Sequence, residues 1–296
     1  MNTTFAKRII ENAVATTEPR WRQYAETWHD IDSIFIRRGY EQQGFLFFRF
    51  VPFLADRGLF SIDVLGSLLD DTRVGTPYDP AYAKELTSPF YRELREGRFG
   101  ANGLFFEEAV RLFKRQDPRS CGRFYWKLLW QMLQACSYLY HHHNGSFARY
   151  LLSSYGKYVG GRNLSDVEFL NEPEDRWLAF LEAIQPWKPL KGISVNVFDF
   201  IIGDVVEARF AKDSYKFDSA NEHFLTVTGI RILLSPFDRP TVIAFLHGLE
   251  LPYTLREINK GIYTYCSETE SENYGYCRSP SRCQSCIVVD ICSRRL

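Results

Sequence analysis

The chain of 296 residues lacks an excess of either charge, any apolar run long enough to span a membrane, and any internal repeat or low-complexity tract. Thirty-six basic residues balance thirty-six acidic ones, which argues against a protein that coats nucleic acid indiscriminately through a basic surface. No sustained apolar segment follows Lys7 and Arg8, so we expect neither a signal peptide nor a membrane partner.

Apolar and aromatic residues are plentiful instead. Hydrophobic residues make up 45% of the chain and aromatic residues 16%, with 24 Phe and 17 Tyr. A core rich in rings accounts for most of them, and stacking surfaces for bases or sugars are the functional alternative. The length predicts one large domain or two closely packed ones. No segment alternates convincingly with period two, so we predict a mostly or wholly α-helical fold.

The clearest helix signal is an apolar stripe at helical spacing from Tyr125 to Tyr140. The sequence His141-His142-His143-Asn144-Gly145 ends it, and Gly145 suits the left-handed position after a helix. Three successive histidines suggest a metal site, but neighbouring helical positions point in different directions, which argues against one. The run Phe45–Phe50 is ambiguous between helix and strand. Further helices are predicted over 174–184, from Val195 to about Ala208, from Asp218 to about Gly229, over 242–249 and from Pro252 to about Tyr265.

Four of the seven cysteines lie within sixteen positions, spaced C-x5-C-x2-C-x5-C: Cys277, Cys283, Cys286 and Cys292. Four thiolates on so short a loop can surround one metal centre, and their number suits a [4Fe–4S] cluster or a structural zinc. Disulfides are the alternative. The odd cysteine total and the isolated Cys121 and Cys136 in apolar patterns favour a reducing compartment, and hence a metal. Cys266 is an alternative first ligand.

Charge is segregated near these cysteines. Glu268, Glu270 and Glu272 form an acidic stretch, whereas the last twenty residues hold four arginines, including Arg278 and Arg282, against one aspartate. Cationic loops of this kind contact phosphates, although a solvated tail would have the same composition.

The cysteine loop resembles the iron–sulfur loop of the endonuclease III and adenine-mismatch glycosylase branch of the helix-hairpin-helix DNA glycosylases. That family spaces its ligands C-x6-C-x2-C-x5-C at the end of an all-α fold, so the last two gaps match and the first is one residue shorter. Upstream, Leu190-Lys191-Gly192-Ile193-Ser194 looks like a degenerate form of the family's hairpin. Phe217-Asp218-Ser219 falls where the family places its essential aspartate.

The resemblance covers about residues 120–296 and implies a helical bundle of the helix-hairpin-helix glycosylase type with a C-terminal iron–sulfur loop. It implies three segments: an unmatched N-terminal helical region (1–120), a glycosylase-like core (121–232) and an iron–sulfur domain (233–296). In the family, the start of the chain often folds back beside the cluster domain. The implied DNA contacts are Lys191, Gly192, Ser194, Arg278 and Arg282.

Two departures bear on activity. Asn196 stands where lyase members carry a lysine, and an amide cannot form a Schiff base. Ser194 replaces the usual second glycine of the hairpin. The resemblance therefore implies a monofunctional glycosylase that hydrolyses the N-glycosidic bond of a flipped, damaged or modified base, with Asp218 as the catalytic carboxylate. Helix capping would equally account for Asp218.

A non-catalytic iron–sulfur protein that binds DNA is the alternative function, and a zinc-stapled helical interaction module is a third. We expect double-stranded DNA as partner, a monomeric state, and a reducing compartment inside the cell, either the cytoplasm with the nucleoid or the nucleus.

Overall fold

The computed structural model describes residues 3–25, 31–68, 111–112, 121–203, 212–268 and 274–293. Every regular element in these ranges is a helix and none is a strand, which confirms the all-α prediction. Within the same ranges, no helix combines the length and the apolar character that crossing a membrane requires.

The chain divides into two compact units. The first contains Met1–His29, Ile202–Val206 and Ala211–Leu296, and the second contains Asp30–Ile201 and Glu207–Phe210. Residues of the expected N-terminal segment 1–120 therefore occur in both units. The boundaries near 120 and 232 were drawn from motif positions, which compactness does not test, and they stay predictions.

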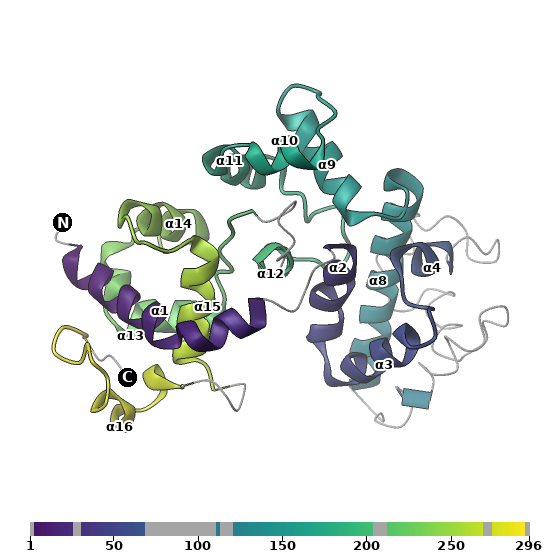
Figure 1. Cartoon of the computed structure of the whole chain (residues 1–296). Coiled ribbons are helices and arrows are strands. Elements are labelled where there is room, and N and C mark those ends of the chain that lie inside the picture. The colour runs from purple at the N-terminus through teal and green to yellow at the C-terminus, as the bar shows by residue number, and fades with distance from the viewer. Residues whose placement is uncertain are drawn as a thin grey trace. The chain divides into compact units, whose positions relative to one another are not determined.

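The first unit joins the N-terminal helix to the last third of the chain (Figure 1). Its elements are α1 (Thr4–Ala25), α13 (Ser219–Val227), η4 (Ile230–Leu233), α14 (Arg239–Gly248), α15 (Leu255–Cys266), η5 (Tyr276–Arg278) and α16 (Pro280–Cys283).

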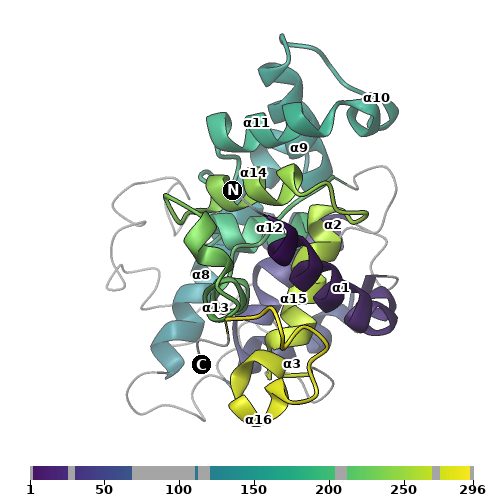
Figure 2. The same ribbon diagram turned by 90° about the vertical axis from the view of Figure 1, so that its left-hand side faces the viewer.

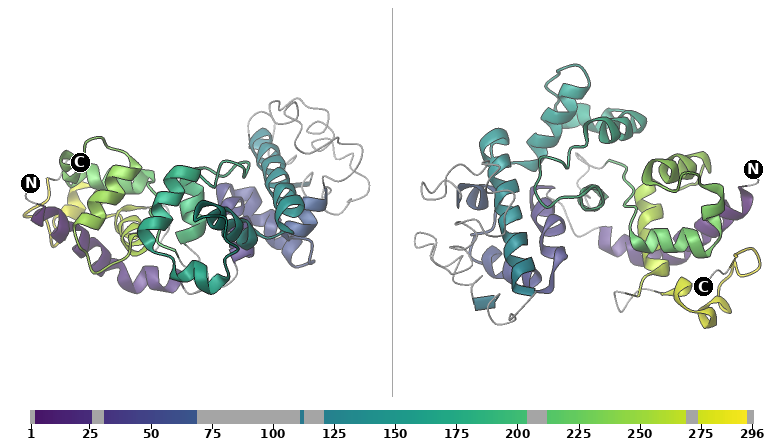
Figure 3. Two further views of the ribbon diagram at one scale, coloured as in Figure 1. Left: turned by 90° about the horizontal axis from the view of Figure 1, so that it is seen from above. Right: turned by 180° about the vertical axis from the view of Figure 1, so that it is seen from behind.

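The second unit contains the long helix α8 and, beside it, α4 (Figure 3). Its elements are α2 (Ile31–Gly39), η1 (Glu41–Gln43), α3 (Phe45–Ala55), α4 (Ile62–Ser67), α8 (Cys121–His143), α9 (Phe147–Tyr158), α10 (Asp166–Asn171), α11 (Glu174–Ile184) and the greater part of α12 (Val195–Gly203).

The helices α1 and α15 of the first unit cross at very short range (Figure 2). A Cβ atom on Gly261 would lie 2.8 Å from the Cα atom of Val14, closer than real Cβ atoms approach backbone, so only glycine fits. Beside this point the Thr17 hydroxyl lies 3.2 Å from the Gly261 carbonyl and 2.8 Å from the Ala13 carbonyl of its own helix. The N-terminal helix thus lies against the helix that leads to the cysteine loop, as the resemblance implies.

Several local predictions are confirmed. The helix over 174–184 has those bounds, Asn144 and Gly145 both adopt the left-handed conformation after α8, and the stripe on α8 is buried at Leu129, Leu133 and Leu139. The ambiguous run Phe45–Phe50 begins a helix, α3. The helix from Val195 is described only to Gly203, so its predicted end near Ala208 lies outside the described residues.

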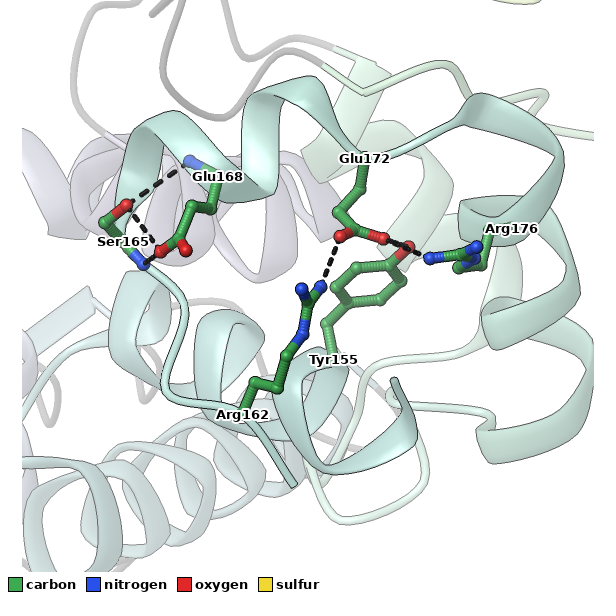
Figure 4. Close-up of polar contacts among 6 residues, drawn as sticks. All are labelled: Tyr155, Arg162, Ser165, Glu168, Glu172 and Arg176. Atoms are coloured by element: carbon green, nitrogen blue, oxygen red, sulfur yellow. Dashed lines mark hydrogen bonds and ion pairs between the residues drawn. The ribbon is translucent and has the colours of Figure 1, made fainter. Parts of the chain in front are cut away.

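A carboxylate holds the α10–α11 corner of the second unit against α9 (Figure 4). Glu172 accepts hydrogen bonds from the Tyr155 hydroxyl at 3.2 Å, from Arg176 at 3.0 Å and from Arg162. Ser165 and Glu168 form a reciprocal capping box at the start of α10. The Glu172 carboxylate thus bonds to three side chains, and we assign it a structural role.

One of the three histidines is set apart by its surroundings. Burial, followed by the charges of His142 and Lys157, lowers the pKa of His143 from 6.5 to about 4. Its Nδ1 atom lies 3.3 Å from the Ser153 hydroxyl, and its ring packs edge-on against Tyr150. Between pH 6.5 and pH 4 this imidazole binds a proton in the unfolded chain but not in the folded chain. The free energy of unfolding therefore falls as the pH drops from 6.5 towards 4.

We predict that His143→Gln reduces this loss of stability, since glutamine takes up no proton. The difference in the free energy of unfolding should not exceed about 1 kcal/mol, because the ring is half-buried and solvent screens it. Urea unfolding followed by helical circular dichroism at pH 7 and pH 5 measures it, with the exposed His141→Gln as control. An equal pH dependence in His143→Gln and the natural chain would contradict the assignment.

Candidate metal centre and aspartate site

The four cysteines of the predicted metal loop lie on tight turns of the first unit. Cys277 belongs to η5, Cys283 ends α16, and the other two follow in consecutive turns. The Cys286 amide donates to the Cys283 carbonyl at 3.1 Å, and the Cys292 amide donates to the carbonyl of buried Val288 at 3.0 Å. All four side chains are half-buried, and none of the four is in a disulfide. Local hydrogen bonds therefore hold the loop in a compact form.

A fifth thiol, that of buried Cys266 at the end of α15, lies against the loop. Its hydrogen bond with Cys277, then burial, raises the pKa of Cys277 well above the usual range, and the nearby sulfurs of Cys292 and Cys286 raise it further. The sulfurs of Cys266, Cys292 and Cys286 are thus near enough to that of Cys277 to oppose its ionisation. Crowded thiols repel each other when ionised, and a bound cation removes that repulsion.

The donor set therefore fits a metal centre, although the described part of the chain contains no group of three or more His, Cys, Asp or Glu side chains already in a ligating arrangement. Cys277, Cys283, Cys286 and Cys292 would supply the four thiolates that a [4Fe–4S] cluster or a structural zinc requires. The Cys283 thiol lies 3.9 Å from the Ser279 carbonyl. The choice between the two metals stays a proposal.

The cysteine loop is attached to α13 at two separate points. The His223 Nε2 atom lies 2.7 Å from the Cys277 carbonyl, which can only accept, so this ring nitrogen carries the proton. Further along, the Ser293 amide donates to the Thr228 carbonyl at 3.2 Å. A Cβ atom on Gly229 would lie 2.0 Å from the Ser293 hydroxyl oxygen, and Gly229 has a positive φ of 84°. Glycine is required at this contact for both reasons.

Asp218 occupies the N-cap position of α13, the helix to which the loop is attached. Its Oδ1 atom accepts from the amides of Ala220 at 3.1 Å and Asn221 at 3.0 Å, and from the Asn221 side chain at 3.0 Å. Its Oδ2 atom lies 3.4 Å from Nζ of Lys216, and 15% of the side chain is exposed. The carboxylate is thus oriented by the helix and neutralised by a lysine two residues away.

Asn221 is itself held in place. The hydroxyl of buried Tyr215 donates to its side-chain oxygen at 2.9 Å, and burial raises the pKa of that phenol well above 10, so it stays protonated. Asp213 binds the start of another helix of the first unit. Its carboxylate accepts from the amides of Leu255 and Arg256 at the start of α15, and burial raises its pKa. An aspartate thus binds the N-terminus of each helix: Asp218 is the N-cap of α13, and Asp213 accepts from the first two amides of α15, whose N-cap is Thr254.

The predicted hairpin residues belong to the second unit, and Asp218 and the cysteines to the first, so each part is described by itself. Gly192 has φ of 81°, as a tight turn requires. The Ser194 hydroxyl accepts from the Val197 amide at 3.3 Å, which confirms it as the N-cap of α12. Lys191 is exposed, and its carbonyl accepts from the Tyr40 hydroxyl.

The two loop arginines are partly engaged inside the protein. The Nε–H group of Arg278 donates to the Cys266 carbonyl at 2.9 Å. Arg282 donates to the Tyr274 carbonyl and lies 3.7 Å from the Glu268 carboxylate. Both side chains are exposed. Their positions on the surface suit phosphate binding, but the contacts of each arginine also stabilise the loop.

Sequence reasoning missed three contacts of the site: His223, Lys216 as the ion-pair partner of Asp218, and Tyr265, whose hydroxyl lies 2.9 Å from the Cys286 sulfur. Each pairs residues that no short motif links. Only Lys216, two positions before Asp218, carried a local signal. Comparisons with protein-family models, with curated proteins and with solved structures found no match to this chain. The motifs and the geometry are therefore what bears on function.

We predict that Cys277→Ala removes most of the bound iron from protein loaded with iron and sulfide, whereas Cys266→Ala leaves it bound. The two thiols are hydrogen-bonded neighbours, so the variants are matched in location and in chemistry. Iron and acid-labile sulfide per chain, with the visible absorption of the protein, measure the outcome. Loss of iron from Cys266→Ala with retention in Cys277→Ala would assign the first ligand to Cys266 instead.

Proposed function

We propose that the protein is a monofunctional DNA glycosylase that removes a flipped, damaged or modified base from double-stranded DNA. The observation that carries this proposal is the attachment of α13 to the four-cysteine loop. The helix, which has Asp218 at its N-terminus, bonds to the loop through the pairs His223–Cys277 and Thr228–Ser293. The carboxylate and the cysteine loop, the two motifs on which the resemblance rests, thus belong to one hydrogen-bonded assembly.

The chemistry requires two things of Asp218: its carboxylate must be ionised, and it must lie beside the sugar. Breaking an N-glycosidic bond develops positive charge on the sugar, and a nearby carboxylate stabilises that charge. The base leaves with the bonding electron pair, water adds to C1′, and the carboxylate orients or deprotonates that water. Base flipping brings the nucleotide out of the stack to reach such a site.

The two oxygens of Asp218 would divide these tasks. Oδ1 is committed to the amides at the start of α13, which fixes the plane of the carboxylate. Oδ2 is the oxygen that would face the sugar, and the Lys216 side chain would turn away from it. This ion pair is partly buried, with 25% of the Lys216 side chain and 15% of the Asp218 side chain exposed, so DNA would have to replace the attraction that it loses.

The remaining residues would bind and orient DNA. Cys277, Cys283, Cys286 and Cys292 would hold a [4Fe–4S] cluster, whose iron–sulfur bonds fix the shape of the loop that carries Arg278 and Arg282. These two arginines, with Lys191 and the backbone around Gly192 and Ser194, would contact phosphates. We propose that the protein acts as a monomer.

A specific observation favours the second candidate, a non-catalytic iron–sulfur protein that binds DNA. The helix cap occupies Oδ1 of Asp218 and the lysine occupies Oδ2, so structural roles alone account for this residue. The two candidates differ in whether abasic product forms.

We predict that Asp218→Asn lowers the yield of abasic sites by about 10²–10⁴-fold, the usual contribution of a positioned acid or base. Asparagine keeps the cap, so stability and DNA binding should persist. Asp238→Asn is the matched control, because Asp238 is the N-cap of α14 in the same unit. Hot alkali reveals abasic sites in duplexes that carry a panel of damaged or modified bases.

Absence of alkali-labile product from the whole panel, in protein with a loaded cluster that still binds the duplexes, would overturn the glycosylase proposal in favour of the DNA-binding one. Equal activity of Asp218→Asn and the natural chain would remove Asp218 from the mechanism. A similar loss in Asp238→Asn would show that the effect lies in capping.

We predict no lyase activity, because position 196 holds an amide that cannot form a Schiff base with an abasic sugar. Borohydride added to protein and abasic duplex should trap no covalent adduct, and strands should break only after alkali. A trapped adduct would contradict this prediction, and its loss in Lys216→Gln but not in Lys191→Gln would then identify the amine beside Asp218 as the nucleophile.

A further inference from the structure

A chain of hydrogen bonds connects the N-terminal helix to one cysteine of the loop. The Thr16 hydroxyl lies 3.5 Å from Oδ1 of Asn12, and the Asn12 Nδ2 atom lies 3.4 Å from the hydroxyl of Tyr265. That hydroxyl lies 2.9 Å from the sulfur of Cys286. Residues of α1, of α15 and of the cysteine loop thus share one polar path inside the first unit.

The direction of the last bond follows from the donors available. The amide nitrogen of Asn12 can only donate, so the Tyr265 oxygen accepts from it. A phenol has a single proton, which is then directed at Cys286. A cysteine that binds metal has lost its own proton and can only accept. In the metal-loaded protein, Tyr265 is therefore the donor and the Cys286 thiolate is the acceptor.

Packing holds the phenol in this position. The Tyr265 ring is 3% exposed, stacks on Tyr276 with centroids 4.7 Å apart, and meets Phe224 of α13 edge-on. A hydrogen bond to a charged sulfur is stronger at such a partly buried position than in water. The hydroxyl cannot swing to solvent without disturbing rings on both sides.

We infer that Tyr265 is a positioning residue for the proposed cluster, that it donates a hydrogen bond to the Cys286 thiolate, and that Asn12 keeps its proton aimed there. The inference rests on the proposed [4Fe–4S] cluster and names a side chain that hydrogen-bonds to one of its ligands. Hydrogen bonds to cluster sulfurs stabilise the more reduced state, so Tyr265 raises the reduction potential. It also makes Cys286 a poorer target for oxidants, because its charge is shared with the phenol.

The test compares three variants of the full-length chain, loaded with iron and sulfide without oxygen. Tyr265→Phe keeps the ring and removes the proton. Asn12→Asp keeps the Tyr265 side chain but replaces a donor by an acceptor, which draws the phenol proton away from the sulfur. Tyr276→Phe is the matched control, since it removes a hydroxyl from the adjacent ring of the same stack.

Midpoint potentials from electron paramagnetic resonance during a mediated reductive titration give the main result. We expect lower potentials and faster bleaching of the cluster in air for Tyr265→Phe and Asn12→Asp, and values equal to the natural chain for Tyr276→Phe. Should Tyr265→Phe fail to fold, Asn12→Asp carries the same comparison with every ring in place.

The outcomes separate this inference from the proposed function. A natural chain that takes up no iron and sulfide would overturn the cluster and the role of Tyr265 together. A loaded cluster whose potential is unchanged in Tyr265→Phe and in Asn12→Asp would overturn the role of Tyr265 alone. Equal shifts in all three variants would show that disturbance of the ring stack, and not the hydrogen bond, sets the potential.

Discussion

The contact on which the cysteine loop most depends is the close crossing of α1 and α15 at Gly261. Because residue 261 has no side chain, the backbone of α1 at Val14 can lie directly against α15. The crossing brings Asn12 within reach of Tyr265, and α15 in turn supports the loop where Arg278 donates to the Cys266 carbonyl. A side chain at 261 would separate the helices and break this series of contacts at its origin.

The cysteine loop is also bonded to the helix that carries Asp218. The start of the loop bonds to α13 where His223 donates to the Cys277 carbonyl, and the end of the loop bonds to it where the Ser293 amide donates to the Thr228 carbonyl. A change in the loop's shape therefore acts on the helix whose N-terminus Asp218 caps. Metal binding to cysteines supplies free energy of folding, since the preformed site does not exist in the unfolded chain. In the proposed glycosylase, a cluster without any chemical step would therefore still determine how well Asp218 is positioned.

Local elements were predictable because their signals are local. The bounds of α11, the left-handed Gly145 and the Ser194 cap follow from caps, glycines and apolar spacing within a few residues. The Phe45–Phe50 run was undecidable, since a short apolar run fits helix and strand alike. Asn12 and Tyr265 escaped prediction for a different reason: they are 253 positions apart, and only the folded α1–α15 crossing brings them together.

Capping and the proposed catalysis make the same demands on Asp218. A helix N-terminus favours negative charge, and charge stabilisation at a sugar requires a negative charge at the same position. A catalytic carboxylate must moreover be held in one orientation. Hydrogen bonds from two backbone amides to Oδ1 do this, and they leave Oδ2 to a partner that can be exchanged. Lys216 is that partner in the free protein. The proposed reaction therefore requires a sugar to take the place of Lys216 at Oδ2.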